Sequence, residues 1–144
     1  MSQSNQPQQA KYFNLHTSGL GYCNRIRDVP VKRGESFVAM SIAALHGHSD
    51  DVQYTYFDCR VSGKQAKAAL EQIRPMIEDK QNKVLISFKI GDLYAEPFVY
   101  KTGAKAGETG ISLKARLLRI DWVSVNGHEL EIEIETETDL ADAA

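Results

Sequence analysis

The sequence predicts an all-β fold that carries one helix between its third and fourth strands. Apolar and polar residues alternate with a period of two over most of the chain, as they do in half-buried strands. Between residues 62 and 77 the apolar residues instead recur at helical spacing. Asn126-Gly127, a dipeptide typical of tight hairpins, precedes one more alternating segment. These observations favour a small β-structure with an added hairpin strand at its C-terminal end.

Length and composition indicate one globular domain. A chain of 144 residues is long enough for one hydrophobic core and too short for two ordinary domains. No apolar run approaches the roughly 18 residues that a membrane span needs, and we expect no signal peptide and no membrane partner. Two cysteines are too few for a disulfide scaffold, so a cytoplasmic location is expected.

The first half of the chain predicts a disordered leader and three strands. Residues 1–10 are polar and Gln-rich and should stay disordered. Strands are expected over 20–27, 37–45 and 52–61, with a turn at 30–34 and a polar loop at 46–51. Alternation places Arg25 and Arg27 together on the face of the first strand that also carries Cys23. In the third strand, one face carries Tyr54, Tyr56, Asp58 and Arg60, and the other carries Thr55, Phe57, Cys59 and Val61.

The second half predicts the helix, two long strands and the hairpin strand. Ser62 and Gln65 resemble a capping box, and Pro75 should kink the helix or end it early. A strand over 84–90 is followed by residues 91–110, which form either an extended hairpin or a mobile loop. The strand over 111–125 puts Lys114 and Arg116 on one face. Isoleucine and glutamate then alternate through residue 135, and 136–144 form a short acidic tail.

This order of elements is the layout of the OB-fold, a five-stranded barrel that often binds oligonucleotides. We therefore expect an OB-fold domain over residues 11–135, with a helix between strands 3 and 4 and an extra C-terminal β-hairpin strand. In that layout, the second and third strands and two long loops line one groove.

Short strings within this layout resemble a known family. FVAMSIAAL (37–45), YTYFDCRVSGK (54–64) and KVLISFKI (83–90) are similar to strands of bacterial single-stranded DNA-binding proteins, including the Gly-Lys that opens their helix. YFNLHTSGLGYCNRIRDV and GISLKARLL look closer to the related replication proteins of integrative and conjugative elements. The resemblance implies protection of single-stranded DNA during replication or transfer of a mobile element. It also implies a homo-oligomer, dimer or tetramer, with replication proteins as further partners.

Stacking surfaces for bases and cations for phosphates are what single-strand binding requires. The resemblance places Tyr56 and Tyr100 near the family's stacking aromatics, although the family's usual tryptophans and its Pro-Phe tip are absent. Phe57, Phe88 and Trp122 are expected in the core or an interface. The candidate nucleic-acid-binding residues are Tyr54, Tyr56, Arg60, Tyr100, Lys101, Lys105, Arg25, Arg27, Lys32, Arg33, Lys114 and Arg116.

The net charge of −2 conceals an uneven distribution of charges. All 17 lysines and arginines lie in residues 1–128, whereas seven of the 19 acids lie in residues 129–144. Residues 1–128 therefore carry a net positive charge, which is consistent with a modest phosphate-binding groove. The acidic end either competes for that groove, contacts partners or only keeps the protein soluble.

Catalytic and metal-binding patterns are weak. His46, His48, Asp50 and Asp51 could ligate a metal, but a polar loop is the simpler interpretation. Cys23 and Cys59 are expected to be buried and unreactive. We expect no enzyme activity, no metal and no cofactor. Two alternatives to single-stranded DNA stay open: an RNA or duplex binder, and a protein–protein adaptor in a replication complex.

Overall fold

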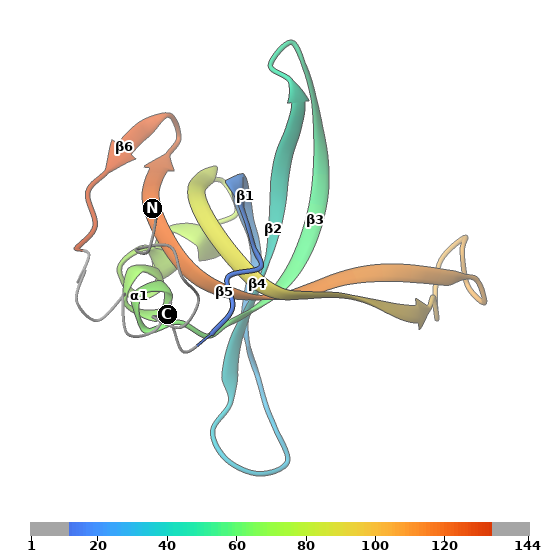
Figure 1. Ribbon diagram of the computed structural model, residues 1–144. Helices are drawn as coiled ribbons and strands as arrows, with labels where there is room; N and C mark the ends of the chain where they lie inside the picture. Colours follow the sequence, from blue (N-terminus) through green and yellow to red (C-terminus); the bar gives the residue numbers. More distant parts are fainter. Residues whose placement is uncertain (1–11, 134–144) are drawn as a thin grey trace, which may run out of the picture.

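The computed structural model describes residues 12–133, so the predicted leader and acidic tail lie outside the described residues. Alternating residues form long strands, and the segment at helical spacing forms one helix (Figure 1). The elements are β1 (His16–Val29), β2 (Phe37–His48), β3 (Asp51–Val61), α1 (Lys64–Glu78), β4 (Val84–Val99), β5 (Thr109–Val125) and β6 (His128–Leu130).

Five strands close into a barrel, as the element order predicts. β1 pairs with β2 and β4, β2 pairs with β3, and β4 pairs with β5, all antiparallel. A parallel pairing of β3 with β5, from Phe57 opposite Leu113 to Val61 opposite Leu117, completes the ring. β6 bonds to the end of β5 outside this ring. The predicted OB-type barrel, with its helix between strands 3 and 4 and its extra strand, is confirmed.

The core fills the barrel interior and the space under α1. Every second residue of β3 faces inward, so Phe57, Cys59 and Val61 are buried. Phe57 contacts Phe88 at a ring-centroid distance of 6.4 Å, and both belong to the core, as predicted. The inward face of α1 presents buried residues at helical spacing, namely Ala66, Ala69, Leu70, Ile73 and Ile77. Trp122 is only half-buried.

The β2–β3 and β4–β5 hairpins extend beyond the barrel, as does the loop between β1 and β2 (Figure 1). The first, the β2–β3 arm, consists of residues 45–54. Because β2 runs to His48 and β3 begins at Asp51, the polar loop expected over 46–51 is wrong and shrinks to a two-residue turn. The second, the β4–β5 arm, consists of residues 92–112 and ends in a loop over residues 100–108. Residues 91–110 are therefore an extended hairpin, the first of the two predicted alternatives.

The start of α1 differs from the predicted capping box. Gly63 is the N-cap, and no side chain among residues 12–133 caps the helix. Ser62 instead accepts a hydrogen bond from Arg116. The side chain of Gln65, only 4% exposed, bonds to both backbone polar groups of Ile120. The helix also continues past Pro75 to Glu78, so the expected early end is wrong.

Replacing Gln65 with leucine is expected to lower the free energy of unfolding by about 2–4 kcal/mol. The Gln65 amide donates to the carbonyl of Ile120 and accepts from its N–H, the latter at 2.7 Å. Leucine fills similar space but leaves both buried groups without this partner. Denaturant unfolding measures the change. The control is Gln72→Leu, whose hydrogen bonds to Ala68 and Glu133 are exposed to solvent, so that water can replace them and we expect a loss of less than about 0.5 kcal/mol. Equal losses in both variants would contradict the explanation.

The C-terminal hairpin turns where predicted but its strand is shorter. Asn126 and Gly127 have φ values of 52° and 85°, the left-handed backbone that a tight type I′ turn requires. β6 then ends at Leu130, so the alternating strand expected through residue 135 is wrong for residues 131–133. Ile132 still packs against the core, as Leu130 does two residues earlier, although the strand pairing has ended.

Candidate nucleic-acid interface

The outward side of β3 carries the residues that its alternation predicts. Because Phe57, Cys59 and Val61 face the core, the intervening Tyr54, Tyr56, Asp58 and Arg60 face outward. Tyr54 is 45% exposed and Tyr56 is 64% exposed. Such exposure of two aromatic rings on one strand leaves their surfaces accessible to a ligand.

The register extends this side across β2 to β1. Tyr56 lies opposite Ala43, which in turn lies opposite Tyr22. The rings of Tyr22 and Tyr54 are 6.5 Å apart, centroid to centroid. Ala39, Ser41 and Ala43 are the small residues of β2 on this side, and all three are buried beneath their larger neighbours. The result is a floor of small side chains between tyrosines on both flanking strands.

The same side continues onto the β4–β5 arm. Asp58 lies opposite Lys114 of β5, and Lys114 lies opposite Tyr94 of β4. Four residues farther along β4, Phe98 shares this side and contacts Tyr100 edge to face, with centroids 4.8 Å apart. We call this continuous surface the outer face, which comprises Tyr22, Asn24, Arg27, Ala39, Ser41, Ala43, Tyr54, Tyr56, Asp58, Arg60, Lys114, Tyr94, Glu96 and Phe98.

A charge cluster lies at the centre of the outer face. Arg27 Nη2 donates to Asp58 Oδ1 at 2.9 Å, and Lys114 Nζ donates to Asp58 Oδ2 at 2.6 Å. Partial burial by itself raises the pKa of Asp58, but the hydrogen bonds from Lys114 and Arg27 outweigh it and leave this pKa below its ordinary value. The carboxylate therefore stays ionised at neutral pH, and the cluster carries two positive charges and one negative charge.

A β-bulge brings Arg27 into this cluster. The register between β1 and β2 shifts between Asn24 and Arg27, so that Arg25 and Ile26 together oppose one residue of β2. Beyond the shift, Arg27 lies on the side of Asn24, while Ile26 packs against the core. The predicted alternation through Arg27 is therefore wrong, because the extra residue exchanges the two faces of the strand.

Arg25 occupies the left-handed position of the bulge, with a φ of 54°, which normally favours glycine. Replacing Arg25 with glycine is expected to raise the free energy of unfolding by about 0.5–1 kcal/mol, because the Cβ strain disappears. Arg25→Ala removes the same charge and keeps the Cβ, so it should give no such gain. Denaturant unfolding of both variants checks this, and equal stability of the two would refute the strain.

The remaining predicted cations do not gather at one place. Arg60 extends the outer face, with its guanidinium 4.2 Å from the ring centroid of Phe37. Arg116, near the middle of β5, lies opposite Arg60 in the parallel β3–β5 pairing and binds Ser62 and Asp92. Arg60 and Arg116 also line an open hollow of about 590 Å³ between the start of β2 and α1.

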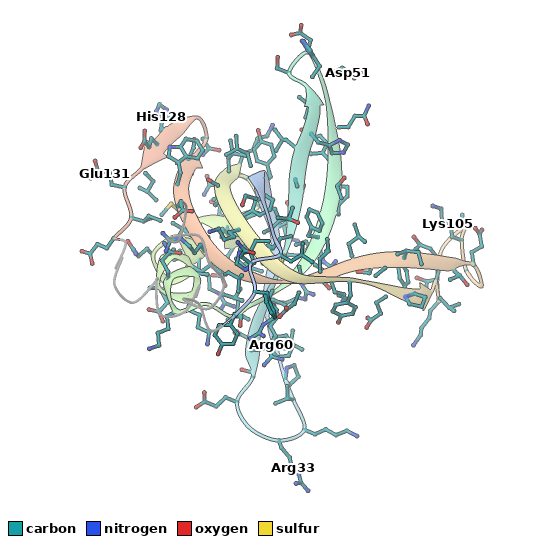
Figure 2. All side chains as sticks on the ribbon, viewed as in Figure 1. Arg33, Asp51, Arg60, Lys105, His128 and Glu131 are labelled. Atoms are coloured by element: carbon teal, nitrogen blue, oxygen red, sulfur yellow. The ribbon has the colours of Figure 1, made fainter. Side chains whose placement is uncertain are left out.

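The predicted loop cations lie in two loops that project from the barrel. Lys32 and Arg33 lie in the loop between β1 and β2, and Arg33 projects from its tip (Figure 2). Lys101 and Lys105 lie in the loop of the β4–β5 arm, where Figure 2 shows Lys105 at the far end. The Lys105 ammonium is 5.6 Å from the ring centroid of Tyr100. The two loops project from different sides of the barrel (Figure 1).

The other residues considered from the sequence do not assemble into a site. Within residues 12–133, no three His, Cys, Asp or Glu side chains gather as metal ligands would. Cys23 and Cys59 are buried and unpaired as thiols, and burial raises the pKa of Cys59 to about 12 and that of Cys23 higher still. No helix in this part of the chain is long and apolar enough to cross a membrane.

Four aromatic residues of this region were not among the predicted site residues: Tyr22, Phe37, Tyr94 and Phe98. Tyr22 could have been found from its alternation with the core residues Gly21 and Cys23. Tyr94 could not have been found in this way, because the register shifts between Gly91 and Tyr94, and alternation therefore does not show which face of β4 carries it. Phe98 then follows Tyr94 at even spacing, and its side depends on the same irregularity.

Comparison with known proteins places the chain in a family. A family model described as a protein of unknown function, DUF3577, matches residues 6–138. The chain belongs to the DUF3577 family. Searches of curated proteins and of solved structures gave no match. The family match covers the whole barrel, so the outer face belongs to the segment that defines the DUF3577 family.

Proposed function

We propose that this DUF3577 protein binds single-stranded DNA on the outer face, without catalysing a reaction. The observation that carries the proposal is the pair of exposed tyrosines on β3, Tyr54 and Tyr56, which together with the half-buried Tyr22 of β1 flank the small-residue floor of β2. Bases stack on exposed aromatic rings regardless of sequence, at about 1–3 kcal/mol per base. Arg27, Arg60 and Lys114 lie beside these rings and supply the positive charge that a phosphate backbone requires.

An unpaired strand suits this surface better than a duplex does. In a duplex the base faces are already stacked on one another, so exposed tyrosine rings gain nothing from them. The β2–β3 arm and the β4–β5 arm both carry outer-face aromatics, Tyr54 on one and Tyr94 on the other, and they extend the surface beyond the barrel (Figure 1). A flexible strand can follow such a bent path, whereas a stiff duplex cannot.

The biological setting follows from the sequence resemblance. We propose a cytoplasmic protein that protects single strands during the replication or transfer of a mobile element, working as a homo-oligomer beside replication proteins. The exposed apolar residues of the β4–β5 arm, including Leu93, Val99 and Ile111, favour contact with a further copy or a partner.

Fluorescence titration tests the function directly. The full chain is titrated with labelled oligo-dT, oligo-U and a duplex of equal length, at about 50 and 200 mM salt. Tight binding of oligo-dT that weakens with salt, and weaker binding of the duplex, is the expected result. Equal binding of duplex and oligo-dT would overturn the single-strand proposal, and preference for oligo-U would favour RNA. No binding at micromolar protein and low salt would leave the adaptor as the better function.

A further inference from the structure

The cations at the centre of the outer face already hold an anion. Arg27 from β1 and Lys114 from β5 each bond to a different oxygen of Asp58 on β3. Their side chains remain 33% and 28% exposed, and that of Asp58 is 19% exposed. The cluster therefore opens to solvent on the same side as Tyr56, two residues before Asp58 on the strand.

A phosphodiester has the chemistry to replace this carboxylate. It carries one negative charge and two terminal oxygens, so it can accept one hydrogen bond from the guanidinium and another from the ammonium. Glu96, at 4.0 Å from the Lys114 ammonium, is the only other carboxylate paired with either cation within residues 12–133. Asp58 is thus the main group with which an incoming phosphate competes.

We propose that Arg27 and Lys114 form a phosphate subsite that Asp58 occupies when no strand is bound. This inference rests on the proposed function and adds a specific role within it. Asp58 orders the two cations on the face and at the same time lowers the affinity for DNA, because each bound phosphate must displace it or share its partners. The protein then binds single strands less tightly than its cations allow, which favours release.

The test compares Asp58→Asn with wild type in oligo-dT titrations. Asparagine keeps the shape of the side chain and removes its charge, so both cations become available to phosphate. We expect about tenfold tighter binding at about 50 mM salt, and a salt slope steeper by about 0.7 for each added phosphate contact. Asp28→Asn is the matched control, because Asp28 is paired with Arg74 of α1 at 3.0 Å and lies off the outer face.

The outcomes separate the inference from the function. If wild type binds oligo-dT and Asp58→Asn binds equally or less tightly, the subsite is wrong. An equal gain in Asp28→Asn would also overturn it, since the effect would then be one of net charge. If neither protein binds, the proposed function itself fails.

A measurement on the wild-type protein avoids dependence on the folding of the variant. The NMR resonance of the Asp58 carboxyl carbon is followed while oligo-dT is added to saturation. Displacement by phosphate is expected to shift it, while the resonance of Asp28 stays in place. An unchanged Asp58 resonance at saturation would refute the proposal.

Discussion

Replacing Tyr54 and Tyr56 together with alanine is expected to weaken oligo-dT binding by about 30-fold or more. Each base stacked on an aromatic side chain contributes about 1–3 kcal/mol, so the loss of two rings costs at least about 2 kcal/mol. Both side chains are exposed, and truncating them removes little core packing. Fluorescence titration measures the affinity, and thermal unfolding verifies that the barrel remains folded.

The control for this double variant is Tyr12→Ala. Tyr12 is 65% exposed and lines an open hollow with Gly63 and Asp92, none of which belongs to the outer face. Its replacement should leave affinity within about twofold of wild type, because its ring meets no base in the proposed path. Equal losses in the two proteins, or no loss in the double variant, would remove the tyrosines of β3 from the site.

Gly63→Ala is expected to destabilise the protein by about 3 kcal/mol or more. A Cβ at this position would lie 2.2 Å from the carbonyl oxygen of Leu118 and 3.0 Å from its carbonyl carbon. Backbone at this point cannot easily move away, because the N–H groups of Ser62 and Gly63 both donate to the Leu117 carbonyl, at 3.0 and 3.2 Å. The clash therefore opposes the β3–β5 pairing that closes the barrel. Denaturant unfolding is the measurement.

Gly19→Ala provides the comparison. A Cβ at Gly19 would meet only the ring of Phe88, at an ordinary distance of 3.6 Å. We expect its free energy of unfolding to stay within about 0.5 kcal/mol of wild type. A Gly63→Ala protein as stable as Gly19→Ala would mean that β5 adapts at Leu118, and that close backbone approach is not why this position is glycine.

The parts of the fold that sequence alone predicted are those where periodicity is regular. Alternation in β3 predicted that Tyr56 and Phe57 lie on opposite faces of the strand, and the helical spacing of apolar residues predicted α1. The prediction for Arg27 went wrong because alternation carries no information about an inserted residue, and Arg25 is not the glycine that usually indicates such a bulge. The role of Gln65 was equally hidden, since its partner Ile120 is 55 residues away.

The candidate site was predicted in part, for a similar reason. Residues on one strand, such as Tyr54 and Tyr56, share a face that local alternation specifies. Whether Lys105 or Arg33 joins them depends on the direction in which a long hairpin or loop projects, which is set by tertiary packing. The pairing of Asp58 with Lys114 also needs the parallel closure of the barrel, because the two residues are 56 positions apart.

The β4–β5 arm has a consequence for the behaviour of the protein at high concentration. The β1–β4 pairing ends at Gly91, and within residues 12–133 no strand pairs with this side of β4 beyond that point, so the arm presents an open edge there. Such an edge can recruit the strand of another molecule and start aggregation. Pro97 lies within this stretch and has no N–H to offer, so it interrupts the row of donors that a foreign strand would need. The chain can thus extend a long ribbon with exposed aromatic rings while limiting indiscriminate strand-to-strand assembly.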